Sequence, residues 1–226
     1  QYWSLPKAER EQTYAGGLTD SLQSGVFNNV WHIDVRSLYP SIILAWGLNP
    51  KNDELAIFSK ILGKLRDFRL QAKDALHNAS GSEWEHFQAL QSTFKILINS
   101  FYGYLGFSMG TFNDYNMAAK VTAEGRAILS KMYKYLEDSG ALIIEMDTDG
   151  IYFCPPEDVK EMSEMEARVQ SILPEGIEVE LDSSYKAMFA YKSKNYALLE
   201  EDGQIKITGA ALKSRGLEPF QRNYMR

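Results

Sequence analysis

Three aspartates in this 226-residue chain have the residue type and the setting to bind divalent cations. Asp34 follows an apolar run, while Asp147 and Asp149 lie in the sequence Asp-Thr-Asp-Gly, which is typical of a turn. Two or three converging carboxylates would bind a pair of Mg²⁺ ions about 4 Å apart, the arrangement that supports in-line phosphoryl transfer. The tetrapeptide alone is a weak signal, because aspartates in such turns usually accept hydrogen bonds from local backbone amides.

A second set of polar residues has helical spacing. Lys95, Asn99 and Tyr102 are spaced i, i+4 and i+7, so they would share one face of a helix. Arg69 and Lys73 share a face in the segment before them. Cations beside an aromatic ring suit a triphosphate with a stacked base. A solvated face with ordinary ion pairs is the alternative for each single residue.

These residues must be positioned by a combination of helices and strands. A strand over 30–34 is predicted to run into a helix start, where Ser37 suits the N-cap and Pro40 is tolerated in the first turn. Apolar residues at helical spacing predict a helix over about 53–79, and a second helix over 83–102 follows a short polar loop. Two long helices joined by so short a loop form an antiparallel hairpin.

The second half of the chain is predicted to contain further helices and strands in an α+β fold. Its central feature is a β-hairpin that carries the acidic turn. The predicted helices are 113–137 and 156–172, and the predicted strands are 141–144, 151–153, 177–181, 187–199 and 204–208, with a hairpin turn at 201–203.

The composition is that of an ordinary globular protein, with 45% hydrophobic and 24% charged residues. The single cysteine, Cys154, can form neither an internal disulfide nor a zinc site alone, which fits a reducing, intracellular compartment. The net charge of −6 argues mildly against nucleic-acid binding. Residues 51–104 nevertheless carry 7 basic and 6 acidic side chains, so the acidic surplus lies in 105–226. That surplus suits a cation site and equally a plain solvated surface.

Three segments resemble, in order and in rough spacing, the polymerase motifs of family-B DNA polymerases. The first two motifs are highly specific, and the similarity covers nearly the whole chain. The segments are Asp34–Ile43, Lys95–Gly103 and Asp147–Gly150, accompanied by Tyr14–Gly17, which resembles the family's linker motif, and by Val121–Arg126, which resembles its palm helix.

The resemblance implies a polymerase palm with an antiparallel sheet and packed helices. Residues 1–50 and 105–226 would form the palm, and 51–104 the inserted fingers hairpin. Exonuclease and thumb domains would be absent from this chain, which would leave an isolated fragment weakly active or inactive. The implied activity is template-directed DNA synthesis, with two Mg²⁺ ions as cofactors and Mn²⁺ able to substitute.

Roles for the acidic residues and for the first motif follow from the same resemblance. Asp34 and Asp149 would be the principal metal ligands, with Asp147 assisting and the Val35 carbonyl completing a coordination shell. Backbone amides of Ser37, Leu38 and Tyr39, at a helix N-terminus, would bind phosphates. The Tyr39 ring would be the steric gate against a ribose 2′-hydroxyl, whereas the sequence alone favours a core aromatic.

The fingers and the DNA contacts are assigned in the same way. Arg69 and Lys95 would bind the triphosphate, and Asn99 and Tyr102 would line the pocket for the nascent base pair. The residues expected to contact primer–template DNA are Lys194, Tyr196 and Arg215. Besides DNA and deoxynucleoside triphosphates, a sliding clamp reached through regions outside this chain is a candidate partner. No membrane partner is expected, and a prokaryotic protein would be cytoplasmic and nucleoid-associated.

The sequence departs from the family pattern at three places. Glu145 stands where the family often has Tyr, two positions before the first Asp of the third motif. The Lys-rich primer-contacting motif is reduced to Ser193-Lys194-Asn195-Tyr196, and Arg215 is one charge where the family has a pair. Fewer phosphate contacts predict weaker, less salt-dependent DNA binding.

Two other functions fit parts of the pattern. A palm-like module that has lost catalysis and only binds DNA or a replication partner is favoured by Glu145 and by the missing basic residues. The retained aspartates and Lys95 favour the enzyme. A nucleotide cyclase-like palm is a weaker alternative, since a cyclase has no use for a hairpin that carries Lys95 and Asn99.

Overall fold

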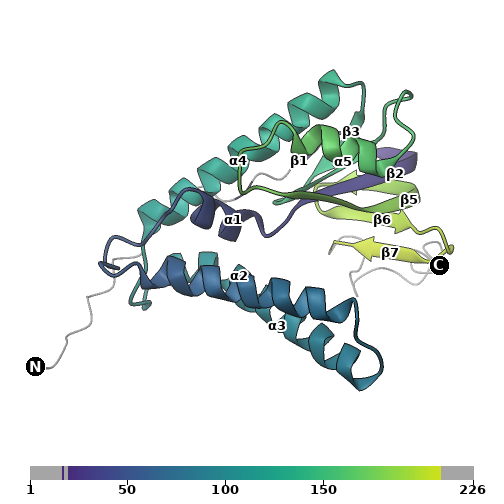
Figure 1. Cartoon of the computed structure of the whole chain (residues 1–226). Coiled ribbons are helices and arrows are strands. Elements are labelled where there is room, and N and C mark those ends of the chain that lie inside the picture. The colour runs from purple at the N-terminus through teal and green to yellow at the C-terminus, as the bar shows by residue number, and fades with distance from the viewer. Residues whose placement is uncertain (1–16, 18–19, 210–226) are drawn as a thin grey trace, which may run out of the picture. The chain divides into compact units, whose positions relative to one another are not determined.

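The computed structural model describes residue 17 and residues 20–209 (Figure 1). Within them the elements are β1 (Asp20–Ser21), β2 (Gly25–Val35), α1 (Leu38–Ala45), α2 (Ile57–Leu76), α3 (Ser82–Leu105), α4 (Tyr115–Asp138), β3 (Leu142–Met146), β4 (Gly150–Cys154), α5 (Met162–Gln170), β5 (Val179–Lys192), β6 (Asn195–Leu199) and β7 (Ile205–Thr208). The predicted α+β class is confirmed.

The described residues divide into two compact units. Residues 17, 35–128 and 173–178 belong to one, called here the helical unit, which contains α1, α2 and α3. Residues 20–34, 129–172 and 179–209 form the other, called here the sheet unit. Helix α4 contributes residues to both. The three predicted metal-binding aspartates all belong to the sheet unit, and the predicted nucleotide-binding residues belong to the helical unit.

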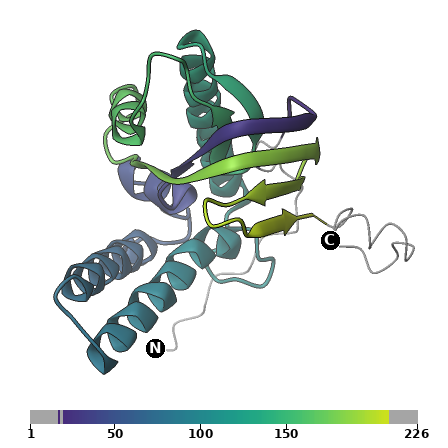
Figure 2. The same ribbon diagram turned by 90° about the vertical axis from the view of Figure 1, so that its right-hand side faces the viewer.

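Helices α2 and α3 form the predicted antiparallel hairpin, and they lie side by side in both views (Figures 1 and 2). Aromatic rings join them, since the Phe58 and Phe101 ring centroids are 4.9 Å apart and those of Phe68 and Phe94 are 6.0 Å apart. The Asp53 carboxylate accepts a 2.7 Å hydrogen bond from the Phe58 amide. That bond satisfies one of the unpaired amides in the first turn of α2.

Helix α1 begins where the sequence predicts, with Ser37 at the N-cap position and Pro40 in the first turn. Ser37, however, has a left-handed backbone with φ of 47°, and its side chain makes no capping hydrogen bond. The neighbouring Ser41 hydroxyl instead donates to the Arg36 carbonyl over 2.8 Å. The helix is anchored by Ile42 and Ile43, both fully buried.

The strands of the sheet unit form one sheet in the order β1-β3-β4-β2-β5-β6-β7. Strand β4 lies between β3 and β2 and is antiparallel to both. Part of the core is a buried apolar cluster on this sheet. Its fully or largely buried members are Val30, Ile144, Tyr152, Met188, Ala190, Tyr196 and Leu198.

Two boundaries differ from the sequence prediction. Helix α5 begins at Met162 rather than near 156, because Val159 is buried and its amide closes a turn onto the Pro156 carbonyl. The predicted strands 177–181 and 187–199 are wrong as divided, since β5 is one strand of 14 residues. The chain then reverses at residues 193–194, where Lys194 adopts a left-handed φ of 56°.

Gly150 generates a stability prediction. A Cβ at this position would lie 2.6 Å from His32 Nε2 and 2.9 Å from the Ile33 carbonyl oxygen, so β2 leaves no room for it. We expect Gly150→Ala to lower the free energy of unfolding by about 1–3 kcal/mol through overpacking. Gly103→Ala is the control, because nothing lies within 4 Å of its Cβ and alanine favours a helix interior by roughly 0.5–1 kcal/mol. Urea denaturation of both variants measures the difference, and equal unfolding midpoints would contradict the steric account.

Candidate active site

Pairing of β2 with β4 brings Asp34 next to the acidic turn. Asp34 at the end of β2 is the cross-strand partner of Gly150 at the start of β4. Asp149 directly precedes Gly150, so Asp34 and Asp149 occupy adjacent positions at one end of the neighbouring strands β2 and β4, called here the sheet edge, although they are far apart in sequence. Asp34 is half-buried, and Asp149 is exposed.

The turn itself is closed around Asp147. Its amide donates to the Gly150 carbonyl over 2.9 Å. Its carboxylate oxygen Oδ1 accepts hydrogen bonds from the Thr148 amide, at 2.7 Å, and from the Thr148 hydroxyl, at 3.3 Å. The same oxygen lies 3.1 Å from the Lys194 ammonium nitrogen. Local hydrogen bonds therefore stabilise the turn, as expected for aspartates in an Asp-Thr-Asp-Gly turn even without a catalytic role.

The two aspartates of the turn have opposite electrostatic settings. Burial raises the pKa of the Asp147 carboxyl, but the Thr148 amide and Lys194 outweigh it and hold the pKa below its ordinary value. Asp149 keeps solvent access, yet surrounding protein atoms displace enough water to raise the pKa of its carboxyl, and the charge of Asp147 raises it further. The charge of the nearby His32 lowers the pKa of the Asp149 carboxyl and so opposes this rise. The site thus concentrates negative charge that a cation would relieve.

Glu145 and Lys194 form a contact that the sequence did not predict. Glu145 on β3 is fully buried, and its Oε1 accepts a 2.6 Å hydrogen bond from the Lys194 backbone amide. Burial raises the pKa of the Glu145 carboxyl, and that hydrogen bond opposes the rise. Lys194 was predicted to contact DNA, and in this structure its ammonium group lies at Asp147 and Thr148. No sequence pattern indicates this contact, because the partners are 49 residues apart.

His32 is a second residue that the sequence analysis missed. It lies two positions before Asp34 on β2, so the alternation of side chains along a strand puts both on one face. Its ring stacks on Tyr152 with centroids 4.3 Å apart. Its Nε2 fills the space where a side chain of Gly150 would be. The alternation of strand residues could have identified it.

In the helical unit, Tyr39 is positioned by two neighbours. Its ring centroid lies 4.3 Å from that of Tyr102, with the ring planes tilted by 36°. A Cβ on Gly125 of α4 would lie 3.0 Å from Tyr39 Cε1, so the absence of a side chain there makes room for the ring. Tyr39 is half-buried rather than part of the core. The structure thus brings together Tyr39 and Tyr102, two of the predicted nucleotide-binding residues.

The other predicted nucleotide-binding residues lie on the same unit. Lys95 and Asn99 are exposed on α3, on the helical face that also carries Tyr102. Arg69 is half-buried on α2. Leu38 is buried at the start of α1, so its predicted contribution is limited to its backbone.

The remaining predicted residues are those expected to contact DNA, the Val35 carbonyl and the linker motif. Tyr196, predicted to contact DNA, is buried in the sheet cluster with its hydroxyl 3.2 Å from that of Tyr152. Val35 is buried at the end of β2, adjacent to Asp34 in the chain. Arg215 lies outside the described residues, as do Tyr14, Ala15 and Gly16 of the predicted linker motif.

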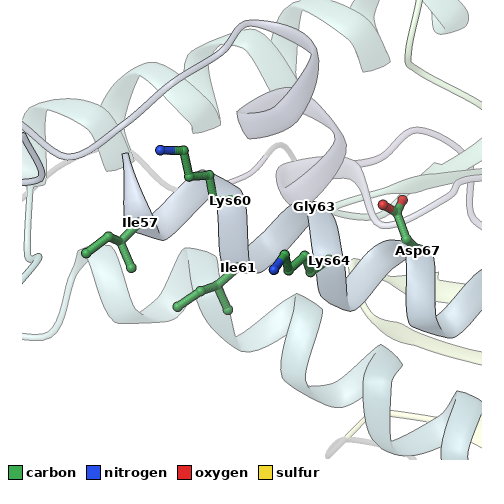
Figure 3. Close-up of a pocket in the computed structure, with 6 residues that line it drawn as sticks. All are labelled: Ile57, Lys60, Ile61, Gly63, Lys64 and Asp67. Atoms are coloured by element: carbon green, nitrogen blue, oxygen red, sulfur yellow. The ribbon is translucent and has the colours of Figure 1, made fainter. Parts of the chain in front are cut away.

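One surface hollow is lined by none of these side chains. It has a volume of about 370 Å³ and is lined by six residues of α2, from Ile57 to Asp67. Lys60 and Asp67 stand on one edge of the helix, and Ile57 and Ile61 on the other (Figure 3). Lys60 donates a hydrogen bond to the Leu55 carbonyl over 2.8 Å. The hollow contains none of the predicted site residues.

A comparison with known families assigns the chain to one of them. The model of DNA polymerase family B matches residues 48–226, which is most of the chain. The chain belongs to DNA polymerase family B. The segments Lys95–Gly103 and Asp147–Gly150 lie within the matched residues.

Family-B relatives match nearly the whole chain at moderate identity. A DNA polymerase of Archaeoglobus fulgidus is 29% identical and covers 91% of this chain. DNA polymerase 1 of Pyrococcus abyssi is 28% identical, and a DNA polymerase of Pyrococcus glycovorans is 30% identical, each over 94% of this chain. The chain spans 29% to 30% of the length of these three relatives.

The fold has a solved counterpart within family B. The family B DNA polymerase from the hyperthermophilic archaeon Pyrobaculum calidifontis superimposes with a TM-score of 0.71 at 20% identity. The superposition covers 98% of this chain and 34% of that one. Among the helices of residues 20–209, none has the length and apolarity needed to cross a membrane.

Proposed function

We propose that this chain carries out template-directed DNA synthesis, joining deoxynucleoside triphosphates to a primer 3′-hydroxyl with two metal ions. The observation that carries the proposal is the pairing of Asp34 with Gly150, which puts two aspartates of separate motifs at one sheet edge. The chain belongs to DNA polymerase family B, and the relatives it matches are named DNA polymerases.

The donor set at this edge fits a hard divalent cation. Within residue 17 and residues 20–209, no three His, Cys, Asp or Glu side chains gather in a way that could hold a metal ion by themselves. Mg²⁺ does not need such a cage, because it commonly binds one or two carboxylates and completes its shell with water and substrate phosphates. Asp34 and Asp149 would be the main ligands, with Asp147 and the Val35 carbonyl assisting. When bound, the ions neutralise developing charge and favour ionisation of the attacking hydroxyl.

Residues of the helical unit would bind the nucleotide. Lys95 and Arg69 would neutralise the triphosphate by charge-assisted hydrogen bonds. The amides at the start of α1, from Ser37 to Tyr39, would donate to phosphate oxygens. Asn99 and Tyr102 would contact the base pair that is being formed. Catalysis of this kind is mostly positioning and electrostatic stabilisation.

The reaction forms a bond between the primer 3′-oxygen and the α-phosphorus. The bond from that phosphorus to the oxygen that bridges to the β-phosphate breaks, and pyrophosphate leaves with the electron pair. The hydroxyl proton passes to solvent.

The proposal also assigns 1–50 and 105–226 to a palm and 51–104 to fingers. The proposed partners are primer–template DNA and a sliding clamp that binds through other regions. The proposed location in a prokaryote is cytoplasmic and nucleoid-associated.

A catalytically inactive palm that only binds DNA or a replication partner is the second candidate. The contact between Lys194 and Asp147 favours it, because a lysine ammonium occupies one oxygen of a predicted metal ligand. The lysine side chain is 52% exposed, however, so it is free to exchange Asp147 for a phosphate at little cost. The two candidates differ in their requirement for Asp149.

The first test of the proposal is Asp149→Asn. We expect this substitution, made in the natural protein, to lower the turnover number for primer extension by at least about 10²-fold. Loss of groups that only orient metal ligands already costs about 10–100-fold. The melting temperature should not fall, because the raised pKa of Asp149 means that its negative charge opposes folding. Asp158→Asn is the control, an exposed aspartate paired with Arg168 at 3.4 Å. Full activity of Asp149→Asn would rule out the metal-binding role.

The second test addresses Tyr39. Truncation to alanine removes the ring held between Tyr102 and Gly125, so ribonucleotides should be incorporated about 10–200-fold more readily relative to deoxyribonucleotides. Tyr39→Phe keeps the ring and should keep the discrimination. Single-nucleotide incorporation with matched ribo- and deoxyribonucleotides measures both ratios. An unchanged ratio in Tyr39→Ala would refute the gate.

A further inference from the structure

Glu145 is a buried carboxylate that the proposed chemistry does not use. It is fully buried on β3, between β1 and β4. Its Oε1 binds the Lys194 amide, and among the described residues its Oε2 has no hydrogen-bond partner. Burying a carboxylate is costly unless hydrogen bonds compensate for the lost water. The contact with Lys194 is therefore the feature that could make a glutamate useful at this position.

Lys194 has a strained backbone that is held from two sides. Its φ of 56° lies in the left-handed region, which residues with a side chain seldom adopt. Glu145 fixes its amide, and Gly209 packs so closely on its carbonyl that an added Cβ would overlap that oxygen. Strained backbones of this kind persist where the surroundings over-determine them, and they cluster at functional sites.

The fixed backbone directs the lysine side chain to the acidic turn. The Lys194 ammonium lies 3.1 Å from Asp147 Oδ1 and 3.5 Å from the Thr148 hydroxyl. The other lysine at this connection, Lys192, lies over the ring of Tyr191 instead, 5.3 Å from its centroid. Of these two lysines, Lys194 is the one whose ammonium group lies at the acidic turn, so its placement decides whether the turn offers a cation to a ligand.

We propose that Glu145 is a positioning residue for Lys194, which binds a backbone phosphate of the DNA beside the acidic turn. The carboxylate holds the connection between β5 and β6 in its strained form, and without that hydrogen bond the Lys194 ammonium would no longer reach the phosphate. Lysine supplies the phosphate contact as a point charge. The inference rests on the proposed function, since DNA is the ligand that supplies the phosphate.

Two substitutions of Glu145 separate the hydrogen bond from the charge. Glu145→Gln and Glu145→Leu both remove the negative charge, but only glutamine can still accept a hydrogen bond from the Lys194 amide. Lys194→Met removes the cation itself. Gly209→Ala would push on the Lys194 carbonyl and on the Asn195 side chain, at a backbone with φ of 101°, and it leaves Glu145 unsubstituted, so it serves if Glu145→Leu does not fold.

The measurement is the salt dependence of primer–template duplex binding by the natural protein, followed by fluorescence anisotropy. The slope of log K against log salt is negative, and each lost phosphate contact reduces its magnitude by about 0.9. A lower slope means a smaller magnitude here. We expect Lys194→Met, Glu145→Leu and Gly209→Ala each to lose about one contact, and Glu145→Gln to lose none. Adding Lys194→Met to Glu145→Leu should cause no further loss, because both remove the same contact.

Two results would overturn the inference. If Lys194→Met lowers the slope and Glu145→Leu does not, Lys194 binds DNA without help from Glu145. If Lys194→Met leaves the slope unchanged, Lys194 contacts no phosphate. Failure of the unsubstituted protein to bind duplex would instead contradict the proposed function. Hydrogen exchange of the Lys194 amide then tests the hydrogen bond from Lys194 to Glu145 by itself. The inference requires slow exchange in Glu145→Gln and fast exchange in Glu145→Leu.

Discussion

The antiparallel pairing of β2 with β4 is the constraint on which the candidate site depends. It makes Asp34 the partner of Gly150 and so joins two motifs that are far apart in the chain. A slip of one residue would turn Asp34 to the opposite face of the sheet. Gly150 permits this register, because a side chain at its position would overlap His32 and the Ile33 carbonyl. The absence of a side chain at one residue therefore allows the two motifs to meet.

Close packing of carboxylates has an electrostatic cost that the surroundings only partly offset. Lys194 and the Thr148 amide lower the pKa of Asp147, whereas the pKa of Asp149 is raised by lost water and by the charge of Asp147. Such opposed shifts in neighbouring groups are typical of functional sites. The Lys194 ammonium lies next to Asp147 in this structure, and under the proposed function it would bind a phosphate of the DNA instead. Glu145 would hold it in that place.

Much of the fold could be predicted from the sequence because its signals are local. Apolar residues at helical spacing predicted α2 and α3, and the acidic turn between β3 and β4 followed from its glycine and aspartates. The division of β5 and β6 could not be predicted, because Lys194 adopts a left-handed backbone without being glycine or asparagine. The aspartates were predicted as metal ligands from their motifs, and the structure brings Asp34 next to the acidic turn. The Glu145 contact was not predicted, because a hydrogen bond between residues far apart in sequence leaves no local pattern.

The most direct test of the account is a calorimetric titration of a deoxynucleoside triphosphate with Mn²⁺ into the natural protein and into Asp149→Asn. The sheet edge formed by Asp34 and Asp149 should give saturable binding in the unsubstituted protein, weakened at least about tenfold in the variant by loss of a metal ligand. Equal binding by both folded proteins would show that the nucleotide and its metal bind elsewhere, and it would contradict the central claim.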